Sequence, residues 1–388
     1  MFDLLKGIRV LDLTAVVLGP FATQYLGDLG ADVIKVEPPS GDIFRYVRPA
    51  RSDGMGAGFL NMNRNKRSIT LDLKSKADQL TFQTLLEEAD VLVHNMRPSA
   101  AKRLGLDPVE ICKRYPLLVY CSSAGFSSTS SFAERPAYDD IIQAAAGVAA
   151  LNSNDKGEPR FLPTIICDKV GGMHLAMAVL GGLVQQQKTG KGCHIDAPMF
   201  DGMIYFLMAE QLAGETFDPA VGSLGYERLT SPYRKPFATK DGFIGVLPYT
   251  KQHWVHFLNF IGREDLATAS WVLSAPDRSE RIGELYALIE KVVPARTSGE
   301  WLQILDELDI PCAPVKSLTE LLNDEYLKEI DLFQEVDHPT EGAIRSTRSP
   351  FTISGSTQLQ DLPAPGLSAE TVPVAWRSRG EDHPPKVP

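Results

Sequence analysis

The sequence predicts an α/β protein with a large Rossmann-like domain, built on a mostly parallel sheet, and a smaller α+β domain after it. Short runs of β-branched and aromatic residues alternate with helical patterns between residues 9 and 122. Strands that alternate with helices usually form a parallel sheet that helices cover on both faces. The chain has 388 residues, more than one typical domain, and its 44% hydrophobic and 23% charged content is ordinary for a globular protein.

The strands expected in the large domain are short apolar runs bounded by charged or turn residues: Arg9–Leu13, Asp32–Val36, Ser68–Leu73, Asp90–His94 and Leu117–Ser122. Helices are expected between them at Phe21–Leu29 and Ala77–Ala89, and a further strand follows Gly192. The first strand is followed by VVLGPFATQ and not by GxGxxG. A nicotinamide-dependent dehydrogenase is therefore disfavoured.

Composition shifts divide the rest of the chain. We expect a large domain, a linker, a small α+β domain and a C-terminal segment, over residues 1–202, 203–225, 226–331 and 332–388. In the small domain, Ser231–Tyr249 predicts a hairpin that turns at Lys240–Gly242, and helical patterns follow. Proline-rich stretches at Leu362–Gly366 and His383–Pro385 predict extended chain on the surface.

Charge and composition argue against several classes of protein. The net charge of −10 disfavours a general nucleic-acid binder, because phosphate backbones require a broad basic surface. The N-terminus lacks the pattern of a secretory signal, and no apolar run approaches, without interruption, the roughly 20 residues that are needed to cross a bilayer. The five cysteines and seven histidines show no CxxC or HExxH spacing. We expect a cytoplasmic protein with no metal, no nucleic-acid partner and no membrane association.

Asp168 is the strongest candidate for a catalytic residue. It ends a short strand-like stretch in PTIICDKVGG, residues 163–172, and a long apolar helix pattern begins behind it. A carboxylate at a helix N-terminus is stabilised by free backbone N–H groups, and an ordinary Asp is ionised at neutral pH. Such a group can attack an activated carbonyl without a separate base, although it can also simply cap the helix. The adjacent Cys167 is read as a packing residue in a strand.

Basic residues cluster near the ends of successive predicted strands in the N-terminal half. In an open α/β sheet, strand ends line the ligand crevice, so an acidic protein that binds phosphates can concentrate its cations there. Each of these residues taken alone is more simply a solvated surface charge. The cluster, which favours a phosphorylated nucleotide as ligand, comprises Arg64, Lys66, Arg67, Lys74, Arg97, Lys102 and Arg103.

Several long segments closely resemble the class III coenzyme A transferases, the family typified by formyl-CoA transferase. They are Gly7–Thr14, Leu18–Asp42, Asn63–Lys74, Arg103–Asp107, Tyr138–Gly147 and Ile310–Val315. The resemblance implies that Asp168 is the catalytic aspartate and that coenzyme A and acyl-CoA are substrates, with no tightly bound cofactor. It also implies a homodimer of interlocked rings, in which the C-terminal segment returns to the large domain.

The resemblance further implies CoA contacts at Val17, Leu18, Leu71, Asp72, Leu73, Lys74, Asn95, Met96, Arg97, Arg103 and Tyr138. Gly171 and Gly172 are expected to let the backbone approach the reacting centre. The chain departs from the family pattern at Val17 and Pro38, where the family often has a polar and a basic residue. The glycine-rich loop of the family is also missing, and only Gly222–Gly225 stands near its place.

The implied reaction transfers coenzyme A to a small organic acid through an aspartyl anhydride and an aspartyl-CoA thioester. An acyl-CoA racemase of the same fold is the nearest alternative, but such racemases have a histidine where this chain has Tyr138, and an unperturbed tyrosine is a poor base at neutral pH. A CoA-binding protein without catalysis is a third reading. Arg228 and Arg234, with Lys235, can meet the second carboxylate of a dicarboxylic acid, although surface charge explains them as well.

Overall fold

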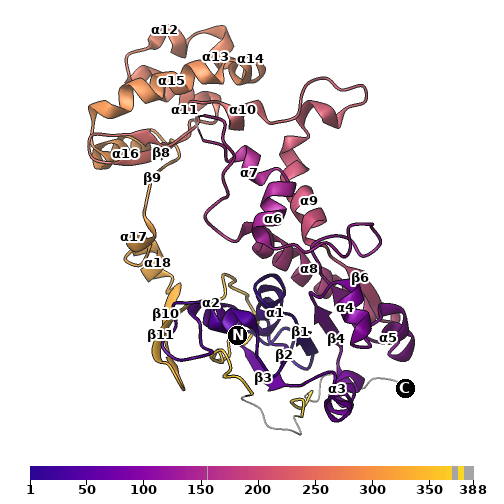
Figure 1. Ribbon diagram of the computed structural model, residues 1–388. Coiled ribbons are helices and arrows are strands. Elements are labelled where there is room, and N and C mark those ends of the chain that lie inside the picture. Colours follow the sequence, from indigo (N-terminus) through magenta and orange to yellow (C-terminus); the bar gives the residue numbers. More distant parts are fainter. Residues whose placement is uncertain (155, 369–374, 380–388) are drawn as a thin grey trace. The chain divides into compact units, whose positions relative to one another are not determined.

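The computed structural model describes residues 1–154, 156–368 and 375–379, so the proline-rich stretch His383–Pro385 lies outside the described residues. The chain forms two compact units (Figure 1). Unit 1 comprises Met1–Leu207 and Asp331–Pro388, and unit 2 comprises Met208–Ile330.

Unit 1 is built on a six-stranded sheet whose strands are all parallel, which confirms the predicted α/β class. Its strand order is β3-β2-β1-β4-β5-β6. The strands are β1 (Arg9–Leu13), β2 (Asp32–Glu37), β3 (Lys66–Thr70), β4 (Val91–His94), β5 (Val119–Ser122) and β6 (Cys193–Asp196). The order reverses between β1 and β4, and open α/β sheets bind ligands at the carboxyl ends of the strands on either side of such a point.

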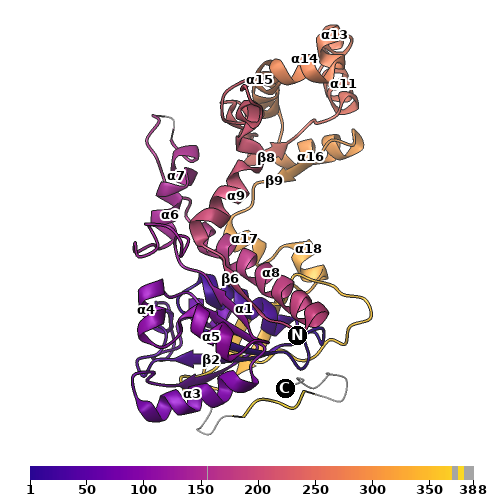
Figure 2. The same cartoon turned by 90° about the vertical axis from the view of Figure 1, so that its right-hand side faces the viewer.

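Helices cover both faces of this sheet (Figure 2). Side chains alternate along each strand, so Val10 of β1 packs with α1 and α8 on one face, and Leu11 packs with α3 on the other. Trp376 closes the second face. The helices of unit 1 are α1 (Leu18–Asp28), η1 (Ile43–Tyr46), α2 (Ala57–Met62), α3 (Lys76–Glu88), α4 (Pro98–Arg103), α5 (Pro108–Arg114), α6 (Asp139–Ala145), α7 (Val148–Leu151), α8 (Ile166–Thr189) and α9, which starts in unit 1 (Met199–Gln211).

Helix α8 is the one described helix that is long and apolar enough to cross a membrane, judged by length and composition alone. Val170, Leu175, Val179 and Leu183 of α8 are buried in the core against the sheet. This packing is that of a core helix, and a single such helix is weak evidence for a membrane span.

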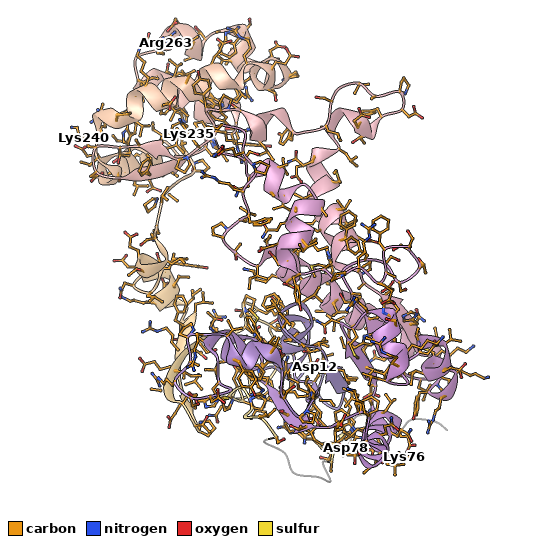
Figure 3. The ribbon with its side chains drawn as sticks, in the orientation of Figure 1. Asp12, Lys76, Asp78, Lys235, Lys240 and Arg263 are labelled. Carbon is orange, nitrogen blue, oxygen red and sulfur yellow. The ribbon has the colours of Figure 1, made fainter. Side chains whose placement is uncertain are left out.

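Strand β3 starts two residues earlier than the predicted Ser68–Leu73 and ends at Thr70. The sequence pattern hides this start because Lys66 and Arg67 look like solvated loop residues. In the structure Lys66 is buried with Asp12, and Arg67 pairs with Asp32. In Figure 3 Asp12 lies inside unit 1, whereas Lys76 and Asp78 lie out on α3.

Unit 2 combines helices with a three-stranded antiparallel sheet of order β7-β8-β9. The predicted hairpin is present, and it turns between β7 (Phe237–Ala238) and β8 (Phe243–Val246). Trp254 and Trp301 are fully buried in its core. The other elements are η2 (Ala213–Thr216), α10 (Glu227–Thr230), α11 (Lys251–Phe260), α12 (Glu264–Ala267), α13 (Ser270–Leu273), α14 (Ala275–Glu280), α15 (Ile282–Val292), η3 (Val293–Ala295), α16 (Ser298–Glu307), β9 (Cys312–Pro314), α17 (Leu318–Leu321) and α18 (Glu325–Glu329).

The C-terminal segment packs on the other elements of unit 1. A hairpin of β10 (Phe333–His338) and β11 (Gly342–Thr347) opens it. Leu362 then exchanges two hydrogen bonds with Asn65, and Trp376 donates to the carbonyl oxygen of Leu85 at 3.1 Å. These contacts join the segment to Asn65, just before β3, and to α3 on the second face of the sheet.

Candidate active site

A cavity of about 340 Å³ lies at the carboxyl ends of β1, β4 and β5, where the strand order reverses. All of its lining residues belong to unit 1. Asp168 lies at this cavity, and the loops that follow the three strands form most of its wall. The principal lining residues are Ala15, Val16, Leu18, Asn95, Met96, Arg97, Arg135, Tyr138, Asp168 and Met199.

The loop between β1 and α1 is held from two sides. Asn95, which follows β4, exchanges two hydrogen bonds with the backbone of Ala15, at 2.8 and 3.0 Å. On the other side, the backbone N–H of Val16 donates to the Asp42 carboxylate at 3.0 Å. Val16 has φ +72°, a left-handed conformation that is unfavourable for a β-branched residue. These contacts therefore hold a strained backbone next to the cavity.

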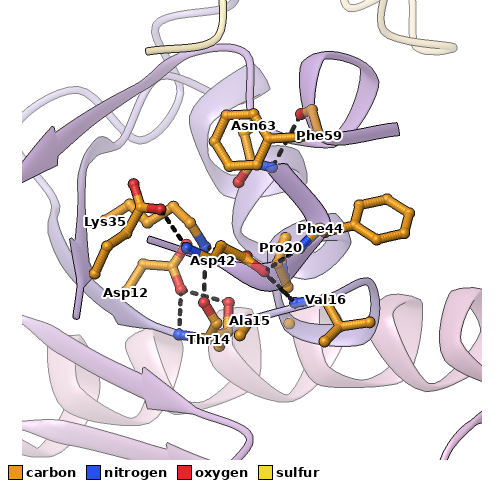
Figure 4. A network of polar contacts seen from close by, with 12 residues as sticks. Asp12, Thr14, Ala15, Val16, Pro20, Lys35, Asp42, Phe44, Phe59 and Asn63 are labelled. Carbon is orange, nitrogen blue, oxygen red and sulfur yellow. Dashed lines mark hydrogen bonds and ion pairs between the residues drawn. The ribbon is translucent and has the colours of Figure 1, made fainter. Parts of the chain in front are cut away.

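Next to this loop lies a buried network of charges that contains Asp12, Lys35 and Asp42 (Figure 4). Lys66 completes the network through its ion pair with Asp12. Lys35 Nζ lies 2.9 Å from Asp42 Oδ2 and donates to the carbonyl oxygen of Thr14 at 2.7 Å. Lys66 Nζ lies 3.2 Å from Asp12 Oδ2. Burial alone raises the pKa of Asp12, but Lys66 and Lys35 outweigh it and hold that pKa below its usual value. Each buried charge thus has an opposite charge beside it.

This network corrects the reading of the basic cluster. Lys66 is buried, and burial lowers its pKa to about 8 although Asp12 offsets part of that effect. Arg64 is buried and pairs with Asp28, and Arg67 pairs with Asp32. These three cations neutralise carboxylates inside unit 1, so they cannot form the phosphate-binding patch expected of them. Arg97 and Arg103 remain exposed candidates.

Asp168 lies in the first turn of α8, as predicted, and is 7% exposed. The stretch before it is not a strand, because α8 begins at Ile166. Burial raises the pKa of Asp168 to about 7, the Asp139 carboxylate adds to the rise, and the backbone N–H of Leu18 offsets part of it. The expectation of an Asp that is fully ionised at neutral pH is therefore wrong, because it ignored this burial. A carboxylate that loses its hydration is a stronger nucleophile than one in water.

Asp139 supports Asp168 from the start of α6. Its Oδ1 accepts hydrogen bonds from the backbone N–H groups of Cys167 at 2.7 Å and Asp168 at 3.1 Å. Its other oxygen accepts from Gln143 Nε2 at 2.6 Å. Asp139 therefore satisfies free N–H groups at the start of α8, the part that a cap residue normally plays. The carboxylate of Asp168 is therefore not needed to cap α8.

Gly171 and Gly172 allow α1 to lie directly on α8. A Cβ at Gly172 would come 2.6 Å from the carbonyl oxygen of Leu18, and one at Gly171 would come 2.7 Å from the Leu18 side chain. Larger residues would push the start of α1 away. The two glycines thus bring the N–H of Leu18 to the carboxylate of Asp168.

The residues expected to contact CoA divide into three groups. Leu18, Asn95, Met96, Arg97 and Tyr138 line the cavity. The side chains of Val17 and Leu71 are buried in unit 1, so only their backbone atoms can meet a ligand. The rest lie outside the cavity lining: Asp72, Leu73 and Lys74 follow the carboxyl end of β3, and Arg103 is in the last turn of α4.

Three residues at the site escaped the sequence analysis. Val16 gave no signal, because its positive φ is set by tertiary contacts. Arg135 lines the cavity from an exposed loop that no pattern marks. Asp139 stood in the Tyr138–Gly147 segment, but nothing in the local pattern marked it as a residue of the site. Burial and the neighbouring Asp139 and Asp168 raise the pKa of Cys167 to about 12, which agrees with a packing residue, although it lies in α8 and not in a strand.

Arg228 and Arg234 both belong to unit 2. Arg228 is half-buried in α10, and Arg234 is exposed in the loop after it. Among the described residues, no group of three or more His, Cys, Asp or Glu side chains is arranged to hold a metal ion.

Comparison with known proteins identifies the class. The family model for CoA-transferase family III matches residues 5–371. The acetyl-CoA:oxalate CoA-transferase of Acetobacter aceti is 34% identical over 82% of this chain and 82% of its own length. The succinyl-CoA:glutarate CoA-transferase of Mus musculus is 30% identical over 95% of this chain and 84% of its own. A crystal structure of Rv3272 from Mycobacterium tuberculosis matches with a TM-score of 0.81 and 29% identity, over 94% of this chain and 97% of that chain.

This chain belongs to CoA-transferase family III. It is a CoA-transferase, an enzyme whose substrates are CoA thioesters.

Proposed function

We propose that this enzyme moves coenzyme A from an acyl-CoA donor to a small dicarboxylic acid, with Asp168 as the nucleophile. The observation that carries the proposal is a buried carboxylate that has no ion-pair partner among the described residues, at the switch point of a parallel sheet. The buried carboxylates of Asp12 and Asp42 are paired with lysines, whereas no cation among the described residues forms an ion pair with Asp168. The names of the two relatives, which specify oxalate and glutarate, support a dicarboxylic acceptor.

The first half of the reaction consists of two acyl substitutions, each of which forms one bond and breaks another. An oxygen of Asp168 attacks the thioester carbonyl carbon, the C–S bond breaks, and CoA leaves as a thiolate while an aspartyl-acyl anhydride forms. The thiolate then attacks the Asp168 carbonyl carbon, and the donor acid leaves as a carboxylate. The result is an aspartyl-CoA thioester, and no proton or electron is gained or lost.

The second half reverses these steps with the acceptor acid. Its carboxylate attacks the aspartyl thioester and releases the thiolate, which then attacks the acceptor carbonyl and frees Asp168. Each attack places negative charge on a carbonyl oxygen. The N–H of Leu18, held next to Asp168 at the start of α1, is a suitable donor to such an oxygen.

We further propose that the cavity at the switch point receives the pantetheine end of CoA. Asn95 and Met96 line it, and Arg97 with Arg135 supplies positive charge at its wall. Arg103 and Lys74, both exposed, are candidates for the more distant phosphates. Binding energy from this remote part of the substrate would hold the thioester against a weak nucleophile.

A homodimer is the proposed assembly, and apolar side chains on the surface of unit 1 support it. On α8, Met173, Met177 and Val184 are 40%, 58% and 48% exposed, and on α9 Tyr205 is 78% exposed. Exposed apolar patches often mark protein interfaces. Interlocked rings predict a single species of twice 42.6 kDa that persists on dilution, which sedimentation can measure. A folded, active monomer would contradict the proposal.

A donor and acceptor screen tests the function. Acetyl-CoA and succinyl-CoA are each mixed with a panel of small acids, and new CoA esters are identified by mass spectrometry. We expect CoA transfer to at least one dicarboxylic acid by the wild type and none by Asp168→Asn. Exchange of the α-hydrogen of the acyl group with deuterium, without any CoA transfer, would instead favour the racemase alternative, and binding without turnover would favour a CoA-binding protein.

A further inference from the structure

The loop Thr14–Val17, between β1 and α1, leads directly to the end of α1 that lies beside Asp168. The first N–H groups of a helix have no partner within the helix, so the residues just before it decide where they point. The residue before α1 is Val17, whose apolar side chain cannot cap the helix. The direction of the Leu18 N–H, which lowers the pKa of Asp168, is therefore set by the loop.

Val16 holds this loop in a conformation that it does not prefer. Its φ of +72° lies in the left-handed region, which is unfavourable for a β-branched residue, so contacts from outside must maintain it. The N–H of Val16 donates to both oxygens of Asp42, at 3.0 Å to Oδ1 and 3.2 Å to Oδ2 (Figure 4). Asp42 thus holds the backbone of the strained residue itself.

Asp42 is fixed in turn by its own partners. It is 3% exposed, its Oδ2 lies 2.9 Å from Lys35 Nζ, and its Oδ1 also accepts from the backbone N–H of Phe44 at 3.0 Å. Lys35 donates to the carbonyl oxygen of Thr14 at 2.7 Å. One buried ion pair therefore holds the loop at two points, at Thr14 through the lysine and at Val16 through the carboxylate.

The first turn of α1 follows the position of this loop. A Cβ added at Gly19 would come 2.2 Å from the Cβ of Thr14, so the helix lies directly on that residue. The N–H of Thr14 and the hydroxyl of Thr23 donate to the two oxygens of Asp12, at 2.9 and 2.6 Å. A displacement of Thr14 therefore displaces the first turn of α1, and with it the N–H of Leu18.

We propose that Asp42 is a positioning residue for the transfer reaction, which holds Val16 so that the Leu18 N–H points at the reacting groups. This inference rests on the proposed function, in which Asp168 is the nucleophile and the Leu18 N–H is a donor to the developing oxyanion. Such a donor is effective only if it is fixed before the reaction begins. Asp42 lies outside the cavity lining, so it acts through the backbone of Val16.

Two substitutions of Asp42 test the proposal. Asparagine has one carbonyl oxygen, which cannot serve both Lys35 and the N–H of Val16. For Asp42→Asn we expect kcat to fall at least about tenfold with little change in the KM of the acyl-CoA donor, because the misplaced donor acts in the transition state. Asp42→Glu keeps the charge beside Lys35 but carries the carboxylate one methylene further. We expect it to lower kcat as well, with a smaller loss of stability.

The pH profile separates positioning from a change of charge. When the Leu18 N–H turns away, the pKa of Asp168 rises, so the acid limb of kcat/KM should move toward higher pH in both Asp42 variants. Loss of the Asp42 charge alone would move the limb of Asp42→Asn the other way. The other titratable or charged groups that line the cavity or act on Asp168 are unchanged in these variants: Arg97, Arg135, Tyr138 and Asp139.

A double-mutant cycle with Val16→Gly tests the route through Val16. Glycine adopts positive φ without a steric penalty. Asp42→Asn should therefore lower kcat less in the Val16→Gly background than in the native one. Asp28→Asn is the matched control, since Asp28 is a buried carboxylate at the far end of α1 that pairs with Arg64. It should lower the Tm and leave kcat and the acid limb in place.

Three results would each overturn the proposal while the transferase function stands. The first is a wild-type kcat and acid limb in both Asp42 variants. The second is an acid limb of Asp42→Asn that moves toward lower pH, which would show a charge effect alone. The third is an equal loss of kcat in the two backgrounds of the cycle. A wild-type rate of transfer by Asp168→Asn would instead contradict the proposed function on which this inference rests.

Discussion

Two groups of buried charges in unit 1 differ in their pairing. Next to the loop between β1 and α1, the carboxylates of Asp12 and Asp42 each face a lysine. At the cavity, the charge that affects the pKa of Asp168 is that of another carboxylate, Asp139, which raises it. In the folded protein, the carboxylates of Asp12 and Asp42 are stabilised by lysines, whereas that of Asp168 has no such partner among the described residues. The difference suggests that the paired charges shape the site and that the unpaired one reacts.

The largest effect should come from the unpaired carboxylate. Asp168→Asn removes the nucleophile and should lower CoA transfer at least about a thousandfold, as measured by formation of the new CoA ester. The binding of CoA should change little, because the side chain acts in covalent chemistry. Transfer at a substantial fraction of the wild-type rate would show that another group is the nucleophile.

The same variant has a built-in folding control. The folded pKa of Asp168, about 7, lies above the value of an unfolded Asp, so the favourable contribution of the protonated form is lost as pH rises from about 4 to about 7. At pH 8 the ionised group is destabilising. Asp168→Asn should therefore have a Tm no lower than that of the wild type at pH 8, and a lower Tm would mean that the loss of activity reflects damage to the fold.

Removing a charge from the buried network of Asp12, Lys35, Asp42 and Lys66 should lower the stability of the fold. Asp12→Asn leaves Lys66 and Lys35 short of one negative charge in a buried site, and we expect a loss of about 3 to 5 kcal/mol in the free energy of unfolding, measured with urea. Asp265→Asn breaks the exposed pair with Arg263 and should cost less than about 1 kcal/mol. Equal losses for the two variants would contradict the account of the network.

Asp139→Asn should alter the pH dependence of the reaction. Asparagine keeps an oxygen for the N–H groups at the start of α8 but removes the charge that raises the pKa of Asp168. The acid limb of kcat/KM reports the ionisation of Asp168, so it should move toward lower pH. Asp140→Asn changes the exposed neighbouring carboxylate and serves as the control. An acid limb that stays in place would show that Asp139 acts only as a cap.

The smallest effect is expected at the wall of the cavity. Arg97→Ala should raise the KM for CoA esters about tenfold and lower kcat less, because a remote phosphate contact stabilises bound substrate and transition state alike. Lys113→Ala, an exposed lysine on α5, is the surface control. A drop in kcat at constant KM would argue that Arg97 contacts the reacting group.

Much of the fold could be predicted because buried parallel strands are continuous apolar runs. The bounds of β1 match the prediction, and β4 starts one residue later than predicted. Strand β3 was misplaced because its start carries Lys66 and Arg67, whose partners come from other strands. Local pattern cannot show that a charge is buried and paired.

The position of Asp168 in a helical first turn could also be predicted, but its pKa could not. That pKa depends on burial and on Asp139, which lies 29 residues earlier in the chain. The strained backbone of Val16 likewise follows from contacts with Asp42, from another part of the chain. Properties set by long-range contacts are the part that sequence reasoning missed.

Trapping with hydroxylamine tests the central claim most directly. The enzyme is incubated with an acyl-CoA donor and then with hydroxylamine, which converts an aspartyl anhydride or thioester to a hydroxamate, and the peptides are analysed by mass spectrometry. We predict modification of the peptide that contains Asp168, dependent on the donor and absent in Asp168→Asn. An unmodified Asp168 peptide in enzyme that turns over normally under the same conditions would contradict the covalent mechanism.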